Sequence, residues 1–550
     1  MRAVLAVIAG LCAGMAQAEG AIAPRLGAAS NFNQGAQPAV LAALPGNGIR
    51  DLRDGLNWNR AETTPGVYDF TGARLAYPAR VAAAGASLSI TLNWGNDLYD
   101  GGDTPHTAQG IAGFAAFAAA VAAQYPGVDA IEVGNEFNGT NFVKGPLKDM
   151  RPADRAAAYA RILAATYVAA KALRPDLRIL GGATHSIPAG YLWQVLDAGG
   201  AGRMDALAIH PYTTPPEQFV RQIAVLRRHP DAAPLPLEVT EFGEPDAALA
   251  VGYFLRNYCQ FALGGVTRAV WFPLTARGDG FVPLFDAGGR ATPVGSAYRY
   301  ADQNFAGKPV ADVAPDAFTY GCRFGPDHIV LWGAARAVVP AAGVAVLTAT
   351  GAVASGPLAL SPTDPLIFHR AGGIDLARDL ALGPQTVLAD SFDQFGYPAA
   401  DGTPPLTDGF VALARSNGRD VALVTRPGQE APGTPWTPYV TAKGQDAVRL
   451  TAETLLPGPS TDLVHRYTAA SDGPVTLTAR FAPGQASVDG IIATVTLNGD
   501  ALAQGAGKDP IDLSLPDLPL AAGDVVEVTV SAGATAKGDL TRYRITVTQP

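Results

Sequence analysis

The sequence is poor in the residues that hold transition metals. It has three cysteines and seven histidines among 550 residues, and no two of the cysteines are closely spaced. A structural zinc site needs four such ligands, usually as short-spaced pairs. The acidic stretches DGGD (100–103) and LNGDA (497–501) lack the ligand spacing of a calcium loop. We therefore expect neither a required metal nor any other cofactor.

Charged residues are scarce as well, at 16% of the chain, and the net charge of -9 comes with no basic stripe. Proteins that bind nucleic acid carry clustered lysines and arginines, so we expect no nucleic-acid partner. Hydrophobic residues make up 48% of the chain, enough to build large cores and too many for a disordered protein. The length of 550 residues predicts roughly two or three domains. The composition leaves the oligomeric state open.

The N-terminal apolar run is too short for a membrane anchor, which needs about 20 such residues. The chain begins with a basic second residue, this short run and the sequence AQA at 16–18. The pattern predicts a signal peptide over residues 1–18. We expect export to the periplasm or the medium, with no membrane span in the mature chain. Export permits a disulfide between Cys259 and Cys322, but the sequence leaves their pairing open.

Residues 19–305 alternate short apolar runs with alanine-rich amphipathic stretches. This repeated alternation predicts a (β/α)8 TIM barrel, an α/β fold. A doubly wound sheet is the rival architecture, but no glycine-rich phosphate loop follows the first strand. The two clearest helices are expected at 111–125 and 153–173. The eight expected strands are 25–30, 49–53, 87–93, 130–135, 177–183, 205–210, 235–240 and 268–272.

Helical periodicity stops after residue 305. Short apolar runs predict a small β-domain over 306–375, packed on the barrel. Residues 376–550 alternate apolar and polar positions between Gly, Asp and Asn turns, which predicts a C-terminal β-sandwich. Such a sandwich can be a carbohydrate-binding module, a spacer or a contact to another protein. Trp436 and Tyr439 are its candidate sugar-stacking residues.

Polar and aromatic residues gather at the carboxyl ends of the expected strands, where the loops of a barrel build its active site. Two carboxylates stand there, Glu136 after the fourth strand and Glu241 after the seventh. Hydrolysis of a glycosidic bond needs one carboxylic acid to protonate the leaving oxygen. It also needs a carboxylate to attack the anomeric carbon or to activate water. The other strand-end residues are Arg53, Trp58, Glu62, Asn93, Trp94, Asn135, His210, Tyr212 and Trp271.

Several of these residues lie in recognisable stretches. VGNEFN (133–138), AIHPYT (208–213) and VTEFGEP (239–245) resemble the glycoside hydrolases of clan A, with families 39, 5 and 79 as the nearest. The run after the second strand, which contains R-x4-W and ends in PGVYDF, is similar to the same enzymes. The resemblance covers residues 23–305 and the small β-domain that follows.

The resemblance implies a role for each matched residue. Glu136 would be the acid/base and Glu241 the nucleophile of a retaining double displacement, with carboxyl groups about 5–5.5 Å apart. Asn135 would bond the sugar 2-hydroxyl, and Arg53 would hold and ionise the nucleophile. The remaining expected substrate contacts are His210 in the site, Tyr212 near the nucleophile, Trp271 as the floor of the subsite, and Asn93 and Trp94 after the third strand.

Three other carboxylates compete for the catalytic roles. Glu132 precedes Glu136 by four residues, about 13 Å along an extended strand, so we expect it to be a buried partner of an arginine. Glu238 has the opposite parity to Glu241 and should point away from the same face. Glu244 can reach the cleft from its loop, but no motif surrounds it.

The sequence thus predicts a secreted retaining glycoside hydrolase whose partner is a β-linked oligo- or polysaccharide. A transglycosylase would share every residue named and differ in how well the cleft excludes water. A non-catalytic polysaccharide-binding protein of an exopolysaccharide system is the other alternative, although a binder has no need of both carboxylates. Gly134 and Phe137 depart from the Trp and Pro that often flank Asn-Glu in the family. The sugar, the linkage and exo or endo action therefore stay open.

Overall fold

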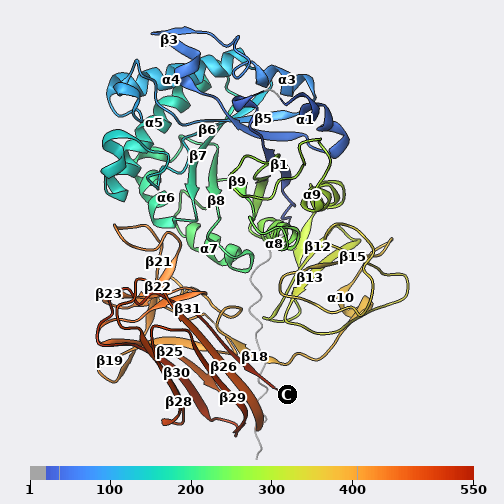
Figure 1. The fold of residues 1–550 in the computed structure, drawn as a ribbon, viewed down its shortest axis with the longest axis vertical. Coiled ribbons are helices and arrows are strands. Elements are labelled where there is room, and N and C mark those ends of the chain that lie inside the picture. Colours follow the sequence, from blue (N-terminus) through green and yellow to red (C-terminus); the bar gives the residue numbers. More distant parts are fainter. Residues whose placement is uncertain (1–19, 36, 406, 550) are drawn as a thin grey trace, which may run out of the picture.

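The computed structural model describes residues 20–35, 37–405 and 407–549, so the predicted signal peptide over 1–18 lies outside the described residues. The first half of the described chain is a closed barrel of eight parallel strands, as predicted (Figure 1). Around the barrel the order is β1-β10-β9-β8-β7-β6-β5-β2. The bounds are β1 Arg25–Ala29, β2 Asp51–Gly55, β5 Ser87–Leu92, β6 Val128–Val133, β7 Arg178–His185, β8 Ala206–His210, β9 Leu237–Phe242 and β10 Val266–Trp271. A short hairpin, β3 (Glu62–Thr64) and β4 (Val67–Tyr68), follows β2.

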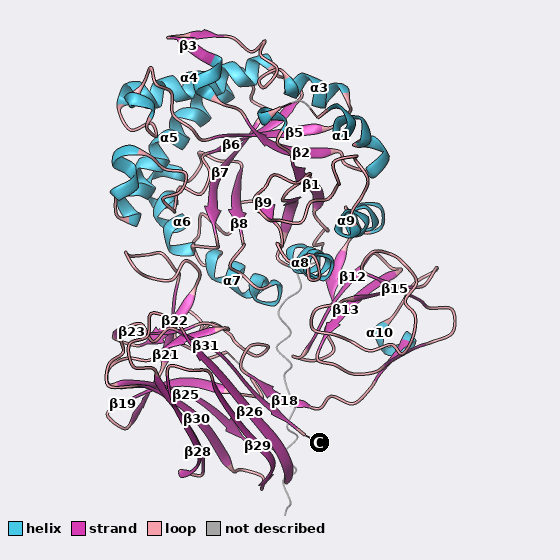
Figure 2. Ribbon diagram, viewed as in Figure 1, coloured by secondary structure: helices cyan, strands magenta, loops and turns pink. Residues whose placement is uncertain are grey.

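Helices cover the outside of the barrel strands (Figure 2). Helix α4 (Ala108–Gln124) begins after Thr107, whose hydroxyl accepts a hydrogen bond from the amide of Gly110 at 3.1 Å. Helix α5 (Pro152–Leu173) begins at a proline, which has no amide hydrogen to leave unpaired in the first turn. Both predicted helices are confirmed. The other helices are α1 Pro38–Ala43, α2 Trp58–Ala61, α3 Tyr77–Ala83, α6 Ala189–Val195, α7 Phe219–Leu226, α8 Ala250–Leu263 and α9 Pro293–Asn304.

A five-stranded antiparallel sheet packs on the barrel through α8 and α9. Tyr258 of α8 stacks on Phe324 of the sheet, with ring centroids 5.8 Å apart. Cys259 of α8 and Cys322 of the sheet form a disulfide, with Cα atoms 5.9 Å apart, which answers the question that the sequence left open. The strands, in sheet order, are β11 Val310–Asp312, β12 Thr319–Phe324, β13 His328–Gly333, β16 Leu366–His369 and β15 Ala345–Thr348.

The junction to the next unit lies later than the sequence suggests. Helix α10 (Leu376–Asp379) and strand β17 (Leu380–Leu382) follow the predicted boundary at 375, yet β17 pairs with β14 (Val338–Pro340). Leu380 also packs in one apolar cluster with Ile329 of the five-stranded sheet. The chain therefore leaves the middle domain after β17, because this segment completes the apolar cover of that domain.

The C-terminal part is a β-sandwich, as predicted. Two antiparallel sheets enclose one apolar core that contains Leu477 from one sheet and Val528 from the other. The first sheet has β18 Val387–Asp390, β21 Leu423–Arg426, β22 Tyr439–Ala442, β23 Gln445–Leu450, β24 Thr454–Leu456, β26 Gly473–Pro483, β29 Ile511–Leu520 and β31 Thr541–Thr548. The second has β19 Val411–Ser416, β20 Arg419–Val421, β25 Thr461–Thr468, β27 Ile491–Leu497, β28 Asp500–Gly507 and β30 Val525–Ala532. Within the described part of the chain, no helix has the length and apolar character needed to cross a membrane.

Candidate active site

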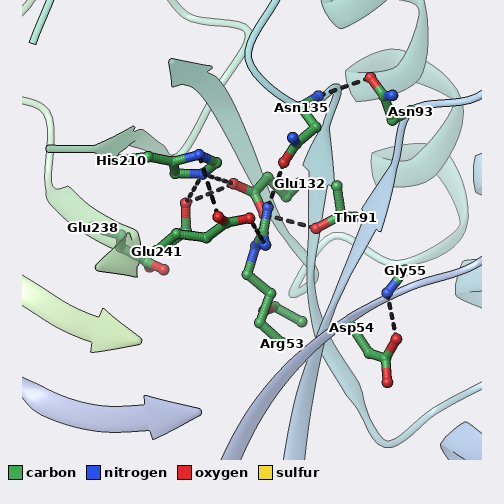
Figure 3. Close-up of polar contacts among 12 residues, drawn as sticks. Arg53, Asp54, Gly55, Thr91, Asn93, Glu132, Asn135, His210, Glu238 and Glu241 are labelled. Carbon is green, nitrogen blue, oxygen red and sulfur yellow. Dashed lines mark hydrogen bonds and ion pairs between the residues drawn. The ribbon is translucent and has the colours of Figure 1, made fainter. Parts of the chain in front are cut away.

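Four polar residues from four strands meet at one end of the barrel (Figure 3). Arg53 lies on β2, Glu132 on β6, His210 at the end of β8 and Glu241 on β9. Each of these four residues is no more than 9% exposed. Because the parallel strands of a barrel present their carboxyl ends on one face, residues distant in sequence share this buried site.

Arg53 binds three partners at once. Its Nη1 donates to Oε1 of Glu241 at 2.5 Å, and its Nη2 donates to Oδ1 of Asn135 at 2.9 Å. Its Nε donates to Oε2 of Glu132, which confirms the expected arginine partner of that carboxylate. The planar guanidinium has donors in a fixed fork, so Arg53 fixes the two carboxylates and the amide relative to one another.

Glu136 has a backbone conformation that few residues adopt. Its φ angle is 49°, in the left-handed region that residues other than glycine rarely adopt. Gly134, two residues earlier, has a φ of 81°. The amide of Glu136 donates to the carbonyl of Ala183 on β7 at 2.6 Å. Backbone strain of this kind collects at functional sites, and here the turn directs the carboxylate of Glu136 toward His210, 3.1 Å away.

The two candidate catalytic carboxylates lie close together. One oxygen of Glu136 and one of Glu241 lie within 4.8 Å of each other. Retaining glycosidases hold their carboxyl groups about 5–5.5 Å apart, whereas inverting enzymes leave about 6.5–9.5 Å for a water molecule. The geometry therefore fits attack by one carboxylate on a bond that the other protonates.

His210 lies between these carboxylates. Its Nδ1 is 3.1 Å from Oε1 of Glu136 and 3.9 Å from Oε2 of Glu241. Its Nε2 is 3.1 Å from the hydroxyl of Thr240, which itself donates to Oε1 of Glu132 at 2.7 Å. The Thr240 hydroxyl has one hydrogen to give, so it accepts from His210 and Nε2 of His210 carries a proton.

The charges of the site set the ionisation of His210 and Glu241. Burial lowers the pKa of the His210 imidazole, but the negative charge of Glu241 and contacts with two further carboxylates outweigh burial and raise this pKa to about 9. Burial raises the pKa of Glu241, but the positive charges of His210 and Arg53 outweigh it and hold this pKa below its usual value. Tyr212 adds to the effect, since its hydroxyl donates to Oε2 of Glu241 at 2.9 Å. These contacts thus favour the ionised form of Glu241.

Two predicted sugar contacts lie elsewhere. Trp271 is completely buried, its Nε1 donates to the carbonyl of Val282 at 3.0 Å, and its ring packs edge-on against Phe242. The prediction that Trp271 floors the subsite is therefore wrong: the indole fills the space between β10 and α8. Asn93 is buried too, and its Oδ1 accepts from the amide of Asn135 at 2.9 Å. Asn93 thus positions Asn135, whereas Trp94 stands partly open at the rim, 37% exposed.

Two of the competing carboxylates, Glu132 and Glu238, are placed differently from the predictions. Glu132 was expected about 13 Å below Glu136, yet both reach His210, since Oε1 of Glu132 lies 3.6 Å from Nε2 of the imidazole. The chain does not stay extended after β6, so the simple rise per residue overestimates the separation. Glu238 does point into the barrel, against the parity argument, but it pairs with Arg268 near the amino ends of the strands. The register of β9 against β10 shifts beyond Glu238, which breaks the alternation before Glu241.

The sequence-based prediction misses three further residues at the site, and it names a fourth, Trp436, without placing it there. Thr240 links His210 to Glu132, and His185 ends strand β7 with its ring 6.0 Å from that of Tyr212. The strand-end rule identifies His185 when it is applied to the fifth barrel strand. Gln429 and Trp436 come from the sandwich and contact Asn138 and His185. No local motif indicates that a loop about 300 residues downstream reaches the barrel mouth. The other candidate sugar-stacking residue, Tyr439, is buried and donates to Glu430.

Metal-binding atoms come together in two groups of described residues. They are Glu136, His210 and Glu241 in the site, and Asp327, His328 and His369 on the five-stranded sheet. In the first group a cation would compete with Arg53 for the carboxylate of Glu241. In the second, the ammonium of Lys308 lies 3.6 Å from Oδ1 of Asp327. One carboxylate in each group thus already faces a protein cation, and we assign a metal to neither.

Comparisons with known proteins extend the structural result. No protein-family model matches the sequence, and no curated protein sequence matches it. A family 39 glycoside hydrolase from the gut symbiont Bacteroides cellulosilyticus WH2 matches the fold with a TM-score of 0.51 and 18% identity, over 63% of this chain and 81% of the other. The aligned part of this chain shares its fold with that structure. A monomeric β-xylosidase from Caulobacter crescentus CB15 aligns over 93% of this chain and 97% of its own, with 17% identity and a TM-score of 0.44. The strand topology and the family 39 structure thus confirm the expected barrel fold.

Proposed function

We propose that this chain is an exported retaining glycoside hydrolase that cleaves a β-linked oligo- or polysaccharide. The observation that carries the proposal is the pair Glu136 and Glu241, with oxygens within 4.8 Å at the mouth of the barrel. Two hydrogen bonds, from Arg53 and Tyr212, hold the carboxylate of Glu241. Among the described residues, His210 is the one side chain that hydrogen-bonds the carboxylate of Glu136. The two environments suit the two roles that the reaction needs.

In the first step, Glu136 gives its proton to the glycosidic oxygen while Glu241 attacks the anomeric carbon. The bond to the leaving group breaks, and a glycosyl-enzyme ester forms at Glu241. In the second step, Glu136 takes a proton from water, and the resulting oxygen attacks the same carbon and releases Glu241. Asn135 accepts from Arg53 through Oδ1, so its amide nitrogen can donate to the 2-hydroxyl of the sugar.

Export is part of the proposal. The disulfide between Cys259 and Cys322 supports it, because such bonds form and persist in oxidising compartments. A transglycosylase is the second candidate, since it would use the same two carboxylates and pass the glycosyl group to a sugar hydroxyl in place of water. Product analysis separates the two reactions, because only transfer yields products longer than the substrate.

A substrate screen tests the proposal. Purified protein is assayed with aryl β-glycosides of the common hexoses and pentoses and with β-linked polysaccharides, and the products are separated by chromatography. We expect cleavage of at least one substrate class and its loss in Glu241→Gln. Glu244→Gln serves as the control that keeps activity, because the carboxylate of Glu244 accepts from the amide of Asp246 within its own loop. Equal activity of Glu241→Gln and the wild type would overturn the assignment.

A further inference from the structure

The loop that joins β21 to β22 of the sandwich, residues 427–438, lies on the mouth of the barrel. Figure 1 shows these orange strands reaching up toward α6. The amide of Gly190, at the start of α6, donates to the carbonyl of Gly428 at 2.9 Å. Gln194, one turn later, donates through its side chain to the carbonyl of Glu430 at 2.9 Å. A Cβ atom at Gly190 would lie 2.6 Å from the Gly428 oxygen, so the barrel leaves room for this loop by having glycine there.

A reciprocal pair of amides fixes the loop beside the acid/base. The side chain of Asn138, two residues after Glu136, donates to Oε1 of Gln429 at 2.9 Å. In return, Nε2 of Gln429 donates to the backbone carbonyl of Asn138 at 2.9 Å. Both side chains are nearly inaccessible, with 2% and 6% exposure. Buried amide groups whose hydrogen bonds are all made hold one geometry. The sandwich loop and the loop after β6 that carries Glu136 therefore form one rigid unit.

Trp436 projects from this unit. Its ring meets that of His185 edge-on, with centroids 5.4 Å apart. Its Cη2 atom lies 3.3 Å from the point where a Cβ of Gly139 would be, so the indole packs over the end of the Glu136 loop. The residue nevertheless remains 41% exposed. A large ring that is anchored on two sides and open on a third is a surface ready for a ligand.

The contacts of Trp436 indicate on which side of the cleaved bond its ring lies. His185 lies next to Tyr212, which binds Glu241, and Gly139 follows the loop of Glu136. In a retaining site the acid/base faces the oxygen of the leaving group. A ring that packs on the Glu136 loop therefore lies on the leaving-group side of the bond that is cleaved.

We propose that Trp436 is a stacking platform for the sugar unit on the leaving-group side, in a subsite built jointly by the barrel and the sandwich. The apolar face of a pyranose ring would lie on the open side of the indole, while His185 and Gly139 support the other sides. This inference rests on the proposed glycosidase function. It implies that the substrate has at least one sugar ring beyond the cleaved bond, and that the sandwich is part of the cleft.

The test compares substrates with and without a leaving-group ring, in the full-length chain. The variants are Trp436→Ala, the conservative Trp436→Phe, and Val488→Ala as a control at an exposed apolar residue of the sandwich. The substrates are a β-linked oligosaccharide that the wild type cleaves and the β-glycosyl fluoride of the same sugar. Fluoride leaves without a ring, so only the oligosaccharide can use the platform.

We expect Trp436→Ala to lower kcat/KM for the oligosaccharide roughly tenfold, the factor of a single stacking contact. The fluoride should be hydrolysed within about twofold of the wild-type rate, and Trp436→Phe should keep most activity on both substrates. Equal losses on both substrates, or no loss on either, would overturn the proposal.

A binding measurement keeps the two proposals separate. Calorimetry compares Glu241→Gln with Glu241→Gln/Trp436→Ala, using cello-, xylo-, manno- and laminari-tetraose as probes. We expect weaker binding of at least one tetraose to the double variant. If the wild type cleaves none of these probes but Glu241→Gln binds one, the catalytic proposal fails, and the affinity difference still decides the role of Trp436. Equal affinities, or no binding of any probe, would overturn the subsite.

Discussion

Nδ1 of His210 lies 3.1 Å from Oε1 of Glu136, inside a site where the imidazole has no exposure to solvent. The same cluster holds one further cation, Arg53, and two further carboxylates, Glu132 and Glu241. Two cations thus face three carboxyl groups, so one carboxyl group can carry a proton while the buried cluster stays neutral. A neutral cluster avoids the high cost of an unpaired buried charge. In the proposed reaction, this proton goes to the leaving group.

The charge of His210 should make the stability of the folded protein depend on pH in the alkaline range. The pKa of this imidazole is raised from 6.5 to about 9, so its charged form stabilises the folded protein. This contribution is fully present below about pH 6.5 and is lost as pH rises through about 9. We expect the thermal midpoint of the wild type to fall from pH 7 to pH 10 more steeply than that of His210→Asn. Parallel curves for the two proteins would show that His210 is not charged in the fold.

Replacing Arg53 with lysine should weaken catalysis and shift its pH profile. A lysine has one ammonium group in place of the fork that binds Glu241, Glu132 and Asn135 together. We expect kcat/KM to fall by roughly 100- to 1000-fold, as when a preorganised donor is removed. The acidic limb of the profile should move to higher pH, because the pKa of Glu241 rises when Arg53 no longer bonds it.

The matched control is Arg268→Lys. Arg268 is buried too and pairs with Asp51 and Glu238, but it lies near the amino ends of the strands. This variant should lose stability and keep the wild-type acidic limb. A shift of the limb in both variants would mean that the effect comes from general destabilisation of the barrel.

Removing the acid should affect substrates according to their leaving groups. In Glu136→Gln the leaving oxygen receives no proton, so cleavage of a sugar–sugar bond should fall by about 100-fold or more. An aryl glycoside with a very good leaving group needs no such help, and its first step should keep nearly its full rate. Rapid-mix kinetics should then show a burst of released phenol followed by slow turnover. A uniform loss for all leaving groups would contradict the role of Glu136 as acid.

The disulfide should stabilise the joint between the barrel and the five-stranded sheet. Cys259 and Cys322 are 63 residues apart in sequence, and closing a loop of that length contributes up to about 4 kcal/mol to the free energy of unfolding. We expect Cys259→Ala/Cys322→Ala to unfold at lower denaturant concentration. Reductant should lower the midpoint of the wild type and leave that of the double variant unchanged. Free thiols at both positions in the unreduced, unfolded wild type would rule out the bond.

The barrel was predictable because its strands are buried on both faces. Each of the eight expected strands overlaps an observed one, and β9, for example, is buried at every residue from Leu237 to Phe242. Continuous apolar runs between helical stretches are the mark of a parallel sheet. Edge and connecting strands of the β-domains carry weaker patterns, so the predicted boundary at 375 places β17 in the wrong domain.

The candidate site was predictable where a short motif names a residue and its strand end places it. Glu136, Glu241, Arg53 and His210 meet as expected for that reason. The prediction for Trp271 is wrong because the sequence shows which strand carries a residue but does not show on which side of that strand its side chain packs. Trp436 could not be assigned to the site, because the contact between sandwich and barrel depends on tertiary docking that leaves no trace in local periodicity.

Trapping the glycosyl-enzyme tests the mechanism most directly. The protein is incubated with the dinitrophenyl 2-deoxy-2-fluoro-β-glycoside of the sugar identified by the substrate screen. The fluorine slows both steps, and the good leaving group lets the first step proceed, so the intermediate accumulates. Digestion and peptide mass spectrometry should find one fluorosugar, esterified to Glu241. A label on Glu136 or another residue, or turnover that yields a product of inverted anomeric configuration, would contradict the assignment of Glu241 as nucleophile and Glu136 as acid/base.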